Sequence, residues 1–366
     1  MSEPHAVFPE PRPVVGRLPK YAAGKPPAPV PGLTPYKLSS NENPLEPLPQ
    51  VLQAVREFED INRYPDPLSS RLRAALAEQL DVPAEDIVTG GGSLGALIQV
   101  LSAYAGTNDD GVPDEVVYPW RSFEAYPIVV DQAGARSVQV PLTFDGRHDL
   151  EAMAAAVSQN TSIVILCTPN NPTGPVLRTA EVEAFIQKVP QDVLIVIDEA
   201  YLEFVRVEDA VDGIAMYRKY PNVLALRTFS KAHGLANLRV GYTVARPEIT
   251  QHLRATAVPF AVSTVAELAA VASVQHQADV EIRVKDLVAE RERIVAALTE
   301  QGWTLPESQG NFVWLALGER AGEFAAAAEA RAITVRAFAG EGVRVSVGET
   351  EGNDRFIELA GEWIRS

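Results

Sequence analysis

The segment VLIVIDEAY, residues 193–201, decides the fold class. Its first five residues are all apolar, which is typical of a parallel β-strand that helices cover on both faces. Asp198 follows directly and lies at the carboxyl end of this strand, where open α/β sheets bind their ligands. Similar short aliphatic or β-branched runs occupy residues 162–167 and 223–226. The pattern predicts an α/β fold with parallel strands and helices on both faces of the sheet.

Helical and strand-like segments alternate around these runs, as judged from the spacing of their apolar residues. The further strands expected are 86–89, 115–118, 312–317 and 342–347. The helices expected are 71–80, which Ser69 and Ser70 can cap, 94–105, an alanine-rich helix between the last two strands, and one long region over 265–301 that ends at Gly302.

The 366 residues divide into three parts by composition. Prolines recur too often between Pro4 and Pro49 for a helix to form, so residues 1–40 are expected to be an extended arm. The alternating strands and helices of residues 41–255 predict a large α/β domain. Residues 256–366 predict a smaller α+β domain, because their long helical region is followed by two strands.

Composition excludes several classes of protein. The 32 lysines and arginines against 48 acidic residues give a net charge of −16, which argues against a general binder of nucleic acid or of anionic membranes. No run approaches the ~18 apolar residues of a membrane span. Cys167 is the single cysteine, so no intrachain disulfide is possible and a cytoplasmic location is expected. Because the chain as a whole is negative, any anionic ligand must be bound by a few positively charged or hydrogen-bonding groups at one site.

Three segments that follow strands carry chemistry: TPNNPTG at 168–174, DEAY at 198–201, and RTFSKAHGL at 227–235, with Arg239 eight residues beyond Lys231. A lysine at a strand end is a candidate for a Schiff base, because partial desolvation makes its amine a nucleophile. Each segment alone has a plainer interpretation: Asp198 as a cap or ion-pair partner, Lys231 as a surface lysine, and the first segment as a turn.

In this order and spacing, the three segments resemble the fold-type I pyridoxal-phosphate aminotransferases. LPKY at 18–21, NENP at 41–44, NRYP at 62–65 and Asn311-Phe312 are similar to segments of the histidinol-phosphate aminotransferase group. The resemblance covers residues 18 to 350 and implies a mostly parallel sheet of the seven-stranded type. It looks closest to the actinobacterial aromatic-amino-acid (phenylalanine) aminotransferases.

The resemblance implies roles for the central residues, with pyridoxal 5'-phosphate as cofactor and no metal. Lys231 is expected to hold the cofactor as a Schiff base and then to move the substrate proton. Asp198 is expected to pair with the pyridine nitrogen, so that the ring accepts electrons. Asn171 and Tyr201 are expected to hydrogen-bond the phenolic oxygen. Phe123 is expected to stack on the ring, with Trp120 as a competing candidate.

The resemblance also implies how the two anions are bound. The cofactor phosphate is expected at the start of a helix, with the donors Arg239, Ser230, Thr228 and the backbone of Gly92 and Ser93. Tyr64 resembles a tyrosine that reaches this phosphate from the neighbouring subunit, which implies a homodimer with shared active sites. The residues expected to bind substrate are Tyr21, Asn41, Asn171, Arg336 and Arg344.

Transfer of an amino group between an aromatic L-amino acid and a 2-oxo acid is the activity expected. The alternative is the transamination of histidinol phosphate, because the same arginines suit a phosphate or a carboxylate. Two features favour the aromatic substrate by resemblance: GGS at 91–93, where histidinol-phosphate enzymes commonly have an acidic residue, and WRSFEAYP at 120–127.

A second class of enzyme competes for one motif. Gly90, Gly92 and Gly95 satisfy the G-x-G-x-x-G pattern of a nicotinamide-dependent dehydrogenase, after a strand and before a helix. The match leaves the three later segments unexplained, whereas a phosphate at a helix start needs the same close backbone approach. The aminotransferase interpretation is therefore preferred.

Overall fold

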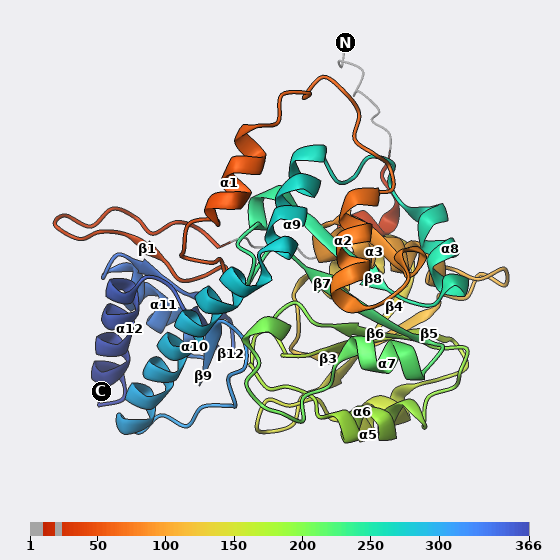
Figure 1. Cartoon of the computed structure of the whole chain (residues 1–366). Coiled ribbons are helices and arrows are strands. Elements are labelled where there is room, and N and C mark those ends of the chain that lie inside the picture. Colours follow the sequence, from red (N-terminus) through yellow and green to blue (C-terminus); the bar gives the residue numbers. More distant parts are fainter. Residues whose placement is uncertain (1–9, 19–23, 366) are drawn as a thin grey trace, which may run out of the picture.

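A computed structural model describes residues 10–18 and 24–365 and centres on a twisted seven-stranded sheet (Figure 1). Six strands are parallel and one, β8, runs antiparallel to its neighbours β2 and β7. The expected α/β fold is confirmed. In spatial order the strands are β2 (Ile87–Gly91), β8 (Val240–Val244), β7 (Val223–Thr228), β6 (Leu194–Asp198), β5 (Thr161–Cys167), β3 (Glu115–Trp120) and β4 (Arg136–Pro141).

Helices cover both faces of this sheet, as the uninterrupted apolar strands require. Figure 1 shows α3 and α8 on one side of the strands and α5, α6 and α7 on the other. The first face packs on α3 (Gly92–Tyr104), α4 (Ala125–Ala133) and α8 (Pro247–Thr256). The second packs on α5 (Leu150–Ala156), α6 (Thr179–Ile186) and α7 (Gly213–Lys219).

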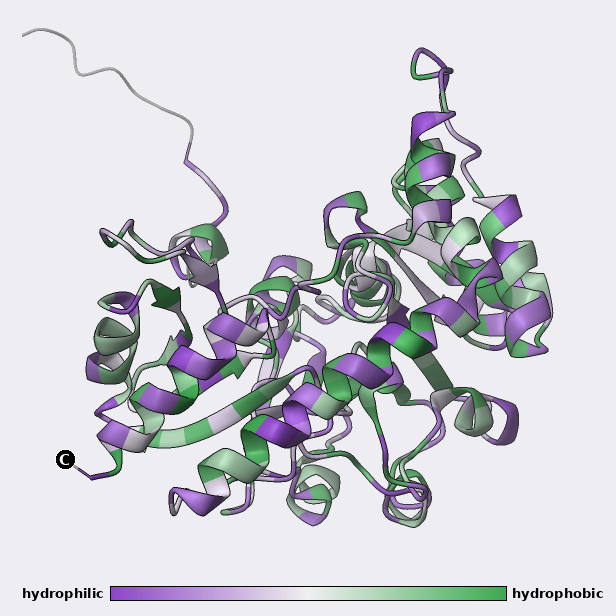
Figure 2. Ribbon diagram, turned by 60° about the vertical axis from the view of Figure 1, so that its left-hand side comes forward, coloured by the Kyte–Doolittle hydropathy of each residue, from purple (hydrophilic) through white to green (hydrophobic). Residues whose placement is uncertain are grey.

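A smaller antiparallel sheet lies in the C-terminal part of the chain, in the order β11 (Arg336–Phe338), β12 (Glu341–Ser346) and β9 (Phe312–Gly318). The two strands expected here are confirmed. The helices beside this sheet are α10 (Gln277–Glu300), α11 (Ala321–Glu329) and α12 (Thr350–Trp363). Hydrophobic and hydrophilic residues alternate along the long helices, as expected for helices that bury one face (Figure 2).

The end of the Pro-rich arm joins this C-terminal part. The short strand β1 (Tyr36–Lys37) pairs in parallel with β10 (Ile333–Thr334) of the same chain. The helices α1 (Pro49–Arg56) and α2 (Ser70–Leu80) then lead into the large sheet and pack against α9 (Thr264–Gln275). The domain boundaries at 40 and 255 stay a prediction.

Two local predictions are wrong. The long helical region over 265–301 is two helices, α9 and α10, because the chain leaves helical geometry at His276, whose Nδ1 lies 2.8 Å from the carbonyl oxygen of Ala272. Ser69 does not cap α2 with its side chain. Asp66 accepts from the Ser70 N–H at 2.8 Å, and buried Glu267, almost 200 residues away, accepts from the N–H groups of Arg71 and Leu72.

Among the described residues, none of the helices combines the length and the apolar character that crossing a membrane requires.

Candidate active site

The alternation of side chains along three central strands brings the predicted site together. Ile163 and Ile165 of β5 and Leu194 and Val196 of β6 all pack on the α3 face of the sheet. Since side chains alternate with period two, Asp198 at the end of β6 points to the same face. By the same count Cys167 ends β5 and Thr228 ends β7 on this face, beside the start of α3.

A cavity of about 350 Å³ lies at this edge of the sheet. Its walls come from the carboxyl ends of the parallel strands, the start of α3, the chain around Ser39, and the small sheet. Of the residues predicted for the site, those that line the cavity are Ser93, Phe123, Asn171, Asp198, Tyr201, Thr228, Ser230, Lys231, Arg239, Arg336 and Arg344.

Asp198 is a buried carboxylate with two hydrogen-bond donors. Tyr126 Oη donates to its Oδ2 at 2.6 Å, and the Ala200 N–H donates to its Oδ1 at 3.3 Å. Burial raises the pKa of Asp198 to about 6, while the Tyr126 hydrogen bond opposes this rise. Asp198 is thus a buried acceptor that is largely ionised at neutral pH and suits a cationic N–H partner.

Lys231 follows β7 and presents a partly desolvated amine to the cavity. Its Nζ donates to the carbonyl oxygen of Ser40 at 3.3 Å and lies 5.8 Å from the ring centroid of Tyr201. Burial, followed by repulsion from Arg344, lowers the pKa of Lys231 to about 7. A large fraction of the amine is therefore neutral and nucleophilic at neutral pH.

Hydroxyl and guanidinium donors gather at the start of α3. Arg239 donates to Ser230 Oγ at 3.2 Å, and Thr228 Oγ1 donates to Ser230 Oγ at 3.0 Å. Gly92 has a φ of 75°, and a Cβ there would collide with the guanidinium of Arg239. Glycine is thus required for Arg239 to lie against the positive end of α3, and the combination suits a dianionic group such as a phosphate.

The opposite wall is a network that joins the arm to the small sheet. Asn41 donates to Tyr201 Oη at 2.9 Å and accepts from Ser346 Oγ at 2.9 Å. Arg344 donates to Asn171 Oδ1 and, at 2.8 Å, to the carbonyl oxygen of Ser39. Asn41 is fully buried. It positions the Tyr201 hydroxyl rather than lining the cavity.

The segment 170–174, which carries Asn171, is held by buried hydrogen bonds. Asn170 accepts from Ser122 Oγ at 2.8 Å and donates to Thr173 Oγ1 at 2.7 Å. The N–H of Gln309 donates to the Gly174 carbonyl at 3.1 Å, so the chain before β9 lies directly over this turn.

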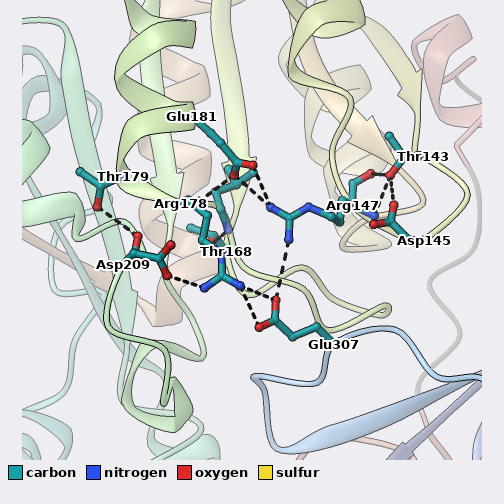
Figure 3. Close-up of polar contacts among 10 residues, drawn as sticks. Thr143, Asp145, Arg147, Thr168, Arg178, Thr179, Glu181, Asp209 and Glu307 are labelled. Atoms are coloured by element: carbon teal, nitrogen blue, oxygen red, sulfur yellow. Dashed lines mark hydrogen bonds and ion pairs between the residues drawn. The ribbon is translucent and has the colours of Figure 1, made fainter.

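An ion-pair network next to this turn holds the same two parts of the chain together (Figure 3). Glu307 accepts from Arg178 at 2.9 Å and lies 3.7 Å from Arg147. Arg178 also contacts Asp209 at 2.7 Å, and Arg147 contacts Glu181 at 2.9 Å. The network joins the start of α6 to the segment that enters the small sheet, and thereby supports the position of Asn171.

The sequence offers two candidates, Phe123 and Trp120, for the aromatic residue that stacks on the cofactor ring. Phe123 lines the cavity, whereas Trp120 is not among the described residues that do so. Trp120 instead packs under the guanidinium of Arg121, whose Cζ lies 4.4 Å from its ring centroid. The geometry is therefore compatible with stacking by Phe123.

Three predicted residues lie elsewhere or are already paired. Tyr64 is 84% exposed and stacks on Phe260 at a ring-centroid distance of 4.8 Å. Arg336 lines the cavity but forms a two-pronged ion pair with Glu124, with contacts of 2.7 Å. Tyr21 lies outside the described residues.

Sequence reasoning missed several residues of the cavity. The hydrogen bond from Tyr126 to Asp198 was not anticipated, although Tyr126 was noted in the aromatic segment. Glu124 and Phe338 line the cavity and were not singled out. The signal for Phe338 is its place two residues after Arg336 on one strand, which puts both on the same face. Among the described residues, no group of three His, Cys, Asp or Glu side chains could hold a metal ion.

Comparison with known families identifies the class of enzyme to which this cavity belongs. The model of the family "Aminotransferase class I and II" matches residues 34–359. The chain belongs to this family. Members of the family depend on pyridoxal 5'-phosphate. The expected class of enzyme and its cofactor are confirmed, and the family leaves the dehydrogenase alternative without support.

Related sequences and structures agree with this assignment. The aminotransferase is 54% identical to an aromatic amino acid aminotransferase of Streptomyces avermitilis, over 93% of this chain and 94% of the relative. It is 52% identical to the enzyme of the same name from Streptomyces coelicolor, over 94% and 95%. A histidinol-phosphate aminotransferase of Sinorhizobium meliloti, solved with pyridoxal 5'-phosphate, is 29% identical with a TM-score of 0.86, over 98% and 99%. The expected resemblance to the aromatic enzymes is confirmed.

The residues of this aminotransferase fit the cofactor by their chemistry. Donors for a phosphate gather at the start of α3, a buried carboxylate ends β6, and a lysine with a lowered pKa lies in the same cavity. These are the groups that a phosphorylated pyridine aldehyde requires: an anion site, a partner for the ring nitrogen and an amine.

Proposed function

We propose that this aminotransferase moves the amino group between an aromatic L-amino acid and a 2-oxo acid. The observation that carries the chemistry is the placement of Lys231, with a pKa near 7, in one cavity with buried Asp198. The aromatic substrate is supported by the Phe123 and Phe338 rings in the cavity wall and by the names of the relatives that are about half identical.

Pyridoxal 5'-phosphate supplies an electron-accepting ring that stabilises negative charge at the substrate Cα. Lys231 would hold the cofactor through its Nζ and, once the substrate amine replaces it, would move the proton from Cα. The Asp198 carboxylate would keep a proton on the pyridine nitrogen. Asn171 and Tyr201 would donate to the phenolic oxygen.

Different residues would bind the two anionic groups. Arg239, Ser230, Thr228 and Ser93, with the backbone at Gly92, would hold the cofactor phosphate. Arg344 would hold the α-carboxylate of the substrate, because it currently donates to neutral oxygens that a carboxylate can replace.

The cofactor absorbance band tests the chemistry. Purified protein is expected to be yellow, and phenylalanine is expected to bleach the band in a single turnover. Lys231→Ala should lose this bleaching while still binding cofactor, with activity reduced at least ~10²-fold. A colourless protein that takes up no pyridoxal phosphate would contradict the proposal.

The same experiment ranks the substrates. Phenylalanine, tyrosine, tryptophan and histidinol phosphate are compared by the ratio of the bleaching rate constant to the dissociation constant. We expect an aromatic amino acid to have the largest ratio. A larger ratio for histidinol phosphate would assign the enzyme to that substrate instead.

A homodimer with shared active sites is also proposed. Tyr64 and Phe260 are exposed and in contact, and the same two segments of the chain carry three more exposed apolar side chains, namely Ile61, Leu68 and Val258. Such a patch is typical of a protein interface, and it presents Tyr64 to a second copy. Mixing inactive Tyr64→Ala chains with inactive Lys231→Ala chains should restore part of the activity, because one site of the mixed dimer is intact. If the mixture recovers no activity, the two subunits do not share their active sites.

We propose a cytoplasmic location from the single buried Cys167, which needs no oxidising compartment. Fractionation of the native cells tests this directly.

A further inference from the structure

Two arginines lie side by side on one face of the small sheet. Arg336 of β11 and Arg344 of β12 are direct partners in the antiparallel register. Directly opposed residues of antiparallel strands project to the same face, so both guanidinium groups point to the cavity that they line. A pocket with two such groups is suited to a dianionic group, such as a phosphate, that both arginines can contact.

The partners of the two arginines differ in charge. Arg344 donates to the amide oxygen of Asn171 and to the carbonyl oxygen of Ser39, which are neutral. Arg336 donates to both carboxylate oxygens of Glu124, from Nη2 at 2.7 Å and from Nε at 3.1 Å. This two-pronged geometry is the strongest form of an arginine–carboxylate pair.

Glu124 is well placed to keep this pair. It is the residue before α4 and therefore lies at the positive end of that helix, which favours a carboxylate. The side chains of Arg336 and Glu124 are 14% and 28% exposed, so solvent weakens their attraction less than at an open surface. Glu124 also lines the cavity next to Phe123.

We propose that Glu124 is a specificity-determining residue that withholds Arg336 from the substrate. The phosphate of histidinol phosphate stands where an amino acid has its α-carboxylate, and its second negative charge must displace Glu124 or lie close to it. Displacement leaves a partly buried carboxylate without its partner, and proximity adds repulsion. The singly charged α-carboxylate of an aromatic amino acid needs only Arg344 and meets neither penalty. This inference rests on the proposed aminotransferase function and refines its substrate class.

A neighbouring ion pair provides a matched control. Arg121 and Glu341 form a second two-pronged pair, with an Nε–Oε2 distance of 2.9 Å, between the same two segments of the chain. Neither residue is among the described residues that line the cavity. Loss of this pair weakens the contact between the segments without changing the charge of the cavity wall.

The test uses the holoenzyme and the ratio of kcat/KM for histidinol phosphate to kcat/KM for phenylalanine. Glu124→Gln should raise this ratio about 10- to 100-fold, as expected when an arginine gains an anionic partner. The gain should come from a lower KM for histidinol phosphate. Glu341→Gln should leave the ratio within about 2-fold of the wild type, and Glu124→Gln with Arg336→Gln should lose the gain.

An unchanged ratio in Glu124→Gln, or an equal rise in Glu341→Gln, would overturn the proposal. Glu124→Ala is scored in the same way where Glu124→Gln does not retain the cofactor. Failure of the proposed aminotransferase function would be seen separately. In that case phenylalanine would not bleach the cofactor absorbance band of the wild-type enzyme.

Discussion

Tyr126 Oη donates a 2.6 Å hydrogen bond to Asp198 Oδ2, and both side chains are buried. The donor comes from the first turn of α4 and the acceptor from the end of β6. The bond opposes the rise in the pKa of Asp198 that burial causes, so it helps to keep the carboxylate ionised near neutral pH. Tyr126 therefore acts on the chemistry of the site through Asp198.

Tyr126→Phe is expected to raise the pKa of Asp198 from about 6 by roughly one to two units, the equivalent of a hydrogen bond to a charged group. The ionised form is present above the pKa, so the acid limb of kcat/KM should move to higher pH. Activity at pH 7 should fall about 2- to 10-fold, with recovery toward pH 9. Tyr118→Phe is the control, since Tyr118 Oη accepts from Gln139 instead. An acid limb that does not move would refute the role of Tyr126.

The lowered pKa of Lys231 predicts the pH dependence of cofactor capture. The neutral amine is the reactive form and is present above the pKa, so the rate of pyridoxal-phosphate uptake by cofactor-free protein should rise with pH around a midpoint near 7. Arg344→Gln should move the midpoint upward, because loss of a nearby positive charge favours the ammonium form. Stopped-flow absorbance measures both. A midpoint near 10 would show that burial does not act on this lysine.

Gly92 and Gly95 should differ sharply when they are changed to alanine. Gly92→Ala places a Cβ against Arg239 at a φ of 75°, so the affinity for cofactor should fall at least ~10-fold. Gly95 lies inside α3, and a new Cβ there would be 3.7 Å from the carbonyl carbon of Gly90 in β2, which is an ordinary contact. Gly95→Ala should therefore keep full affinity and stabilise the protein by up to about 1 kcal/mol. Cofactor titration and thermal unfolding measure these effects. Equal effects of the two changes would contradict the role of Gly92 beside Arg239 at the start of α3.

Phe123 and Trp120 are expected to have separate roles. Phe123→Ala should weaken cofactor binding by about 0.5–1.5 kcal/mol, the usual value of an aromatic stacking contact, with little loss of stability. Trp120→Ala should lower the free energy of unfolding by about 3 kcal/mol, because the ring packs under Arg121 and against Tyr118. Cofactor dissociation constants and denaturant unfolding distinguish them. The reverse pattern would make Trp120 the stacking residue.

Prediction from sequence worked best where a strand ends in a reactive residue. The strands that precede Asp198 and Lys231 are recognisable because their apolar runs are uninterrupted, and the carboxyl ends of parallel strands share one edge. It failed at Ser69, because the cap of α2 depends on Glu267 from another part of the chain, and at His276, whose local contact with Ala272 ends α9. The start of α2 is therefore set by a tertiary partner.

The sequence by itself determined the α/β class, the edge of the sheet that carries the cavity, and the residues that end the strands at this edge. These features follow from strand propensity and side-chain alternation, which act between near neighbours in the chain. Tertiary structure alone decided that Tyr126 meets Asp198, 72 residues away, and that Glu124 meets Arg336, 212 residues away. Both contacts arise where separate elements pack. The strength of a hydrogen bond or an ion pair there depends on burial, which spacing along the sequence does not encode.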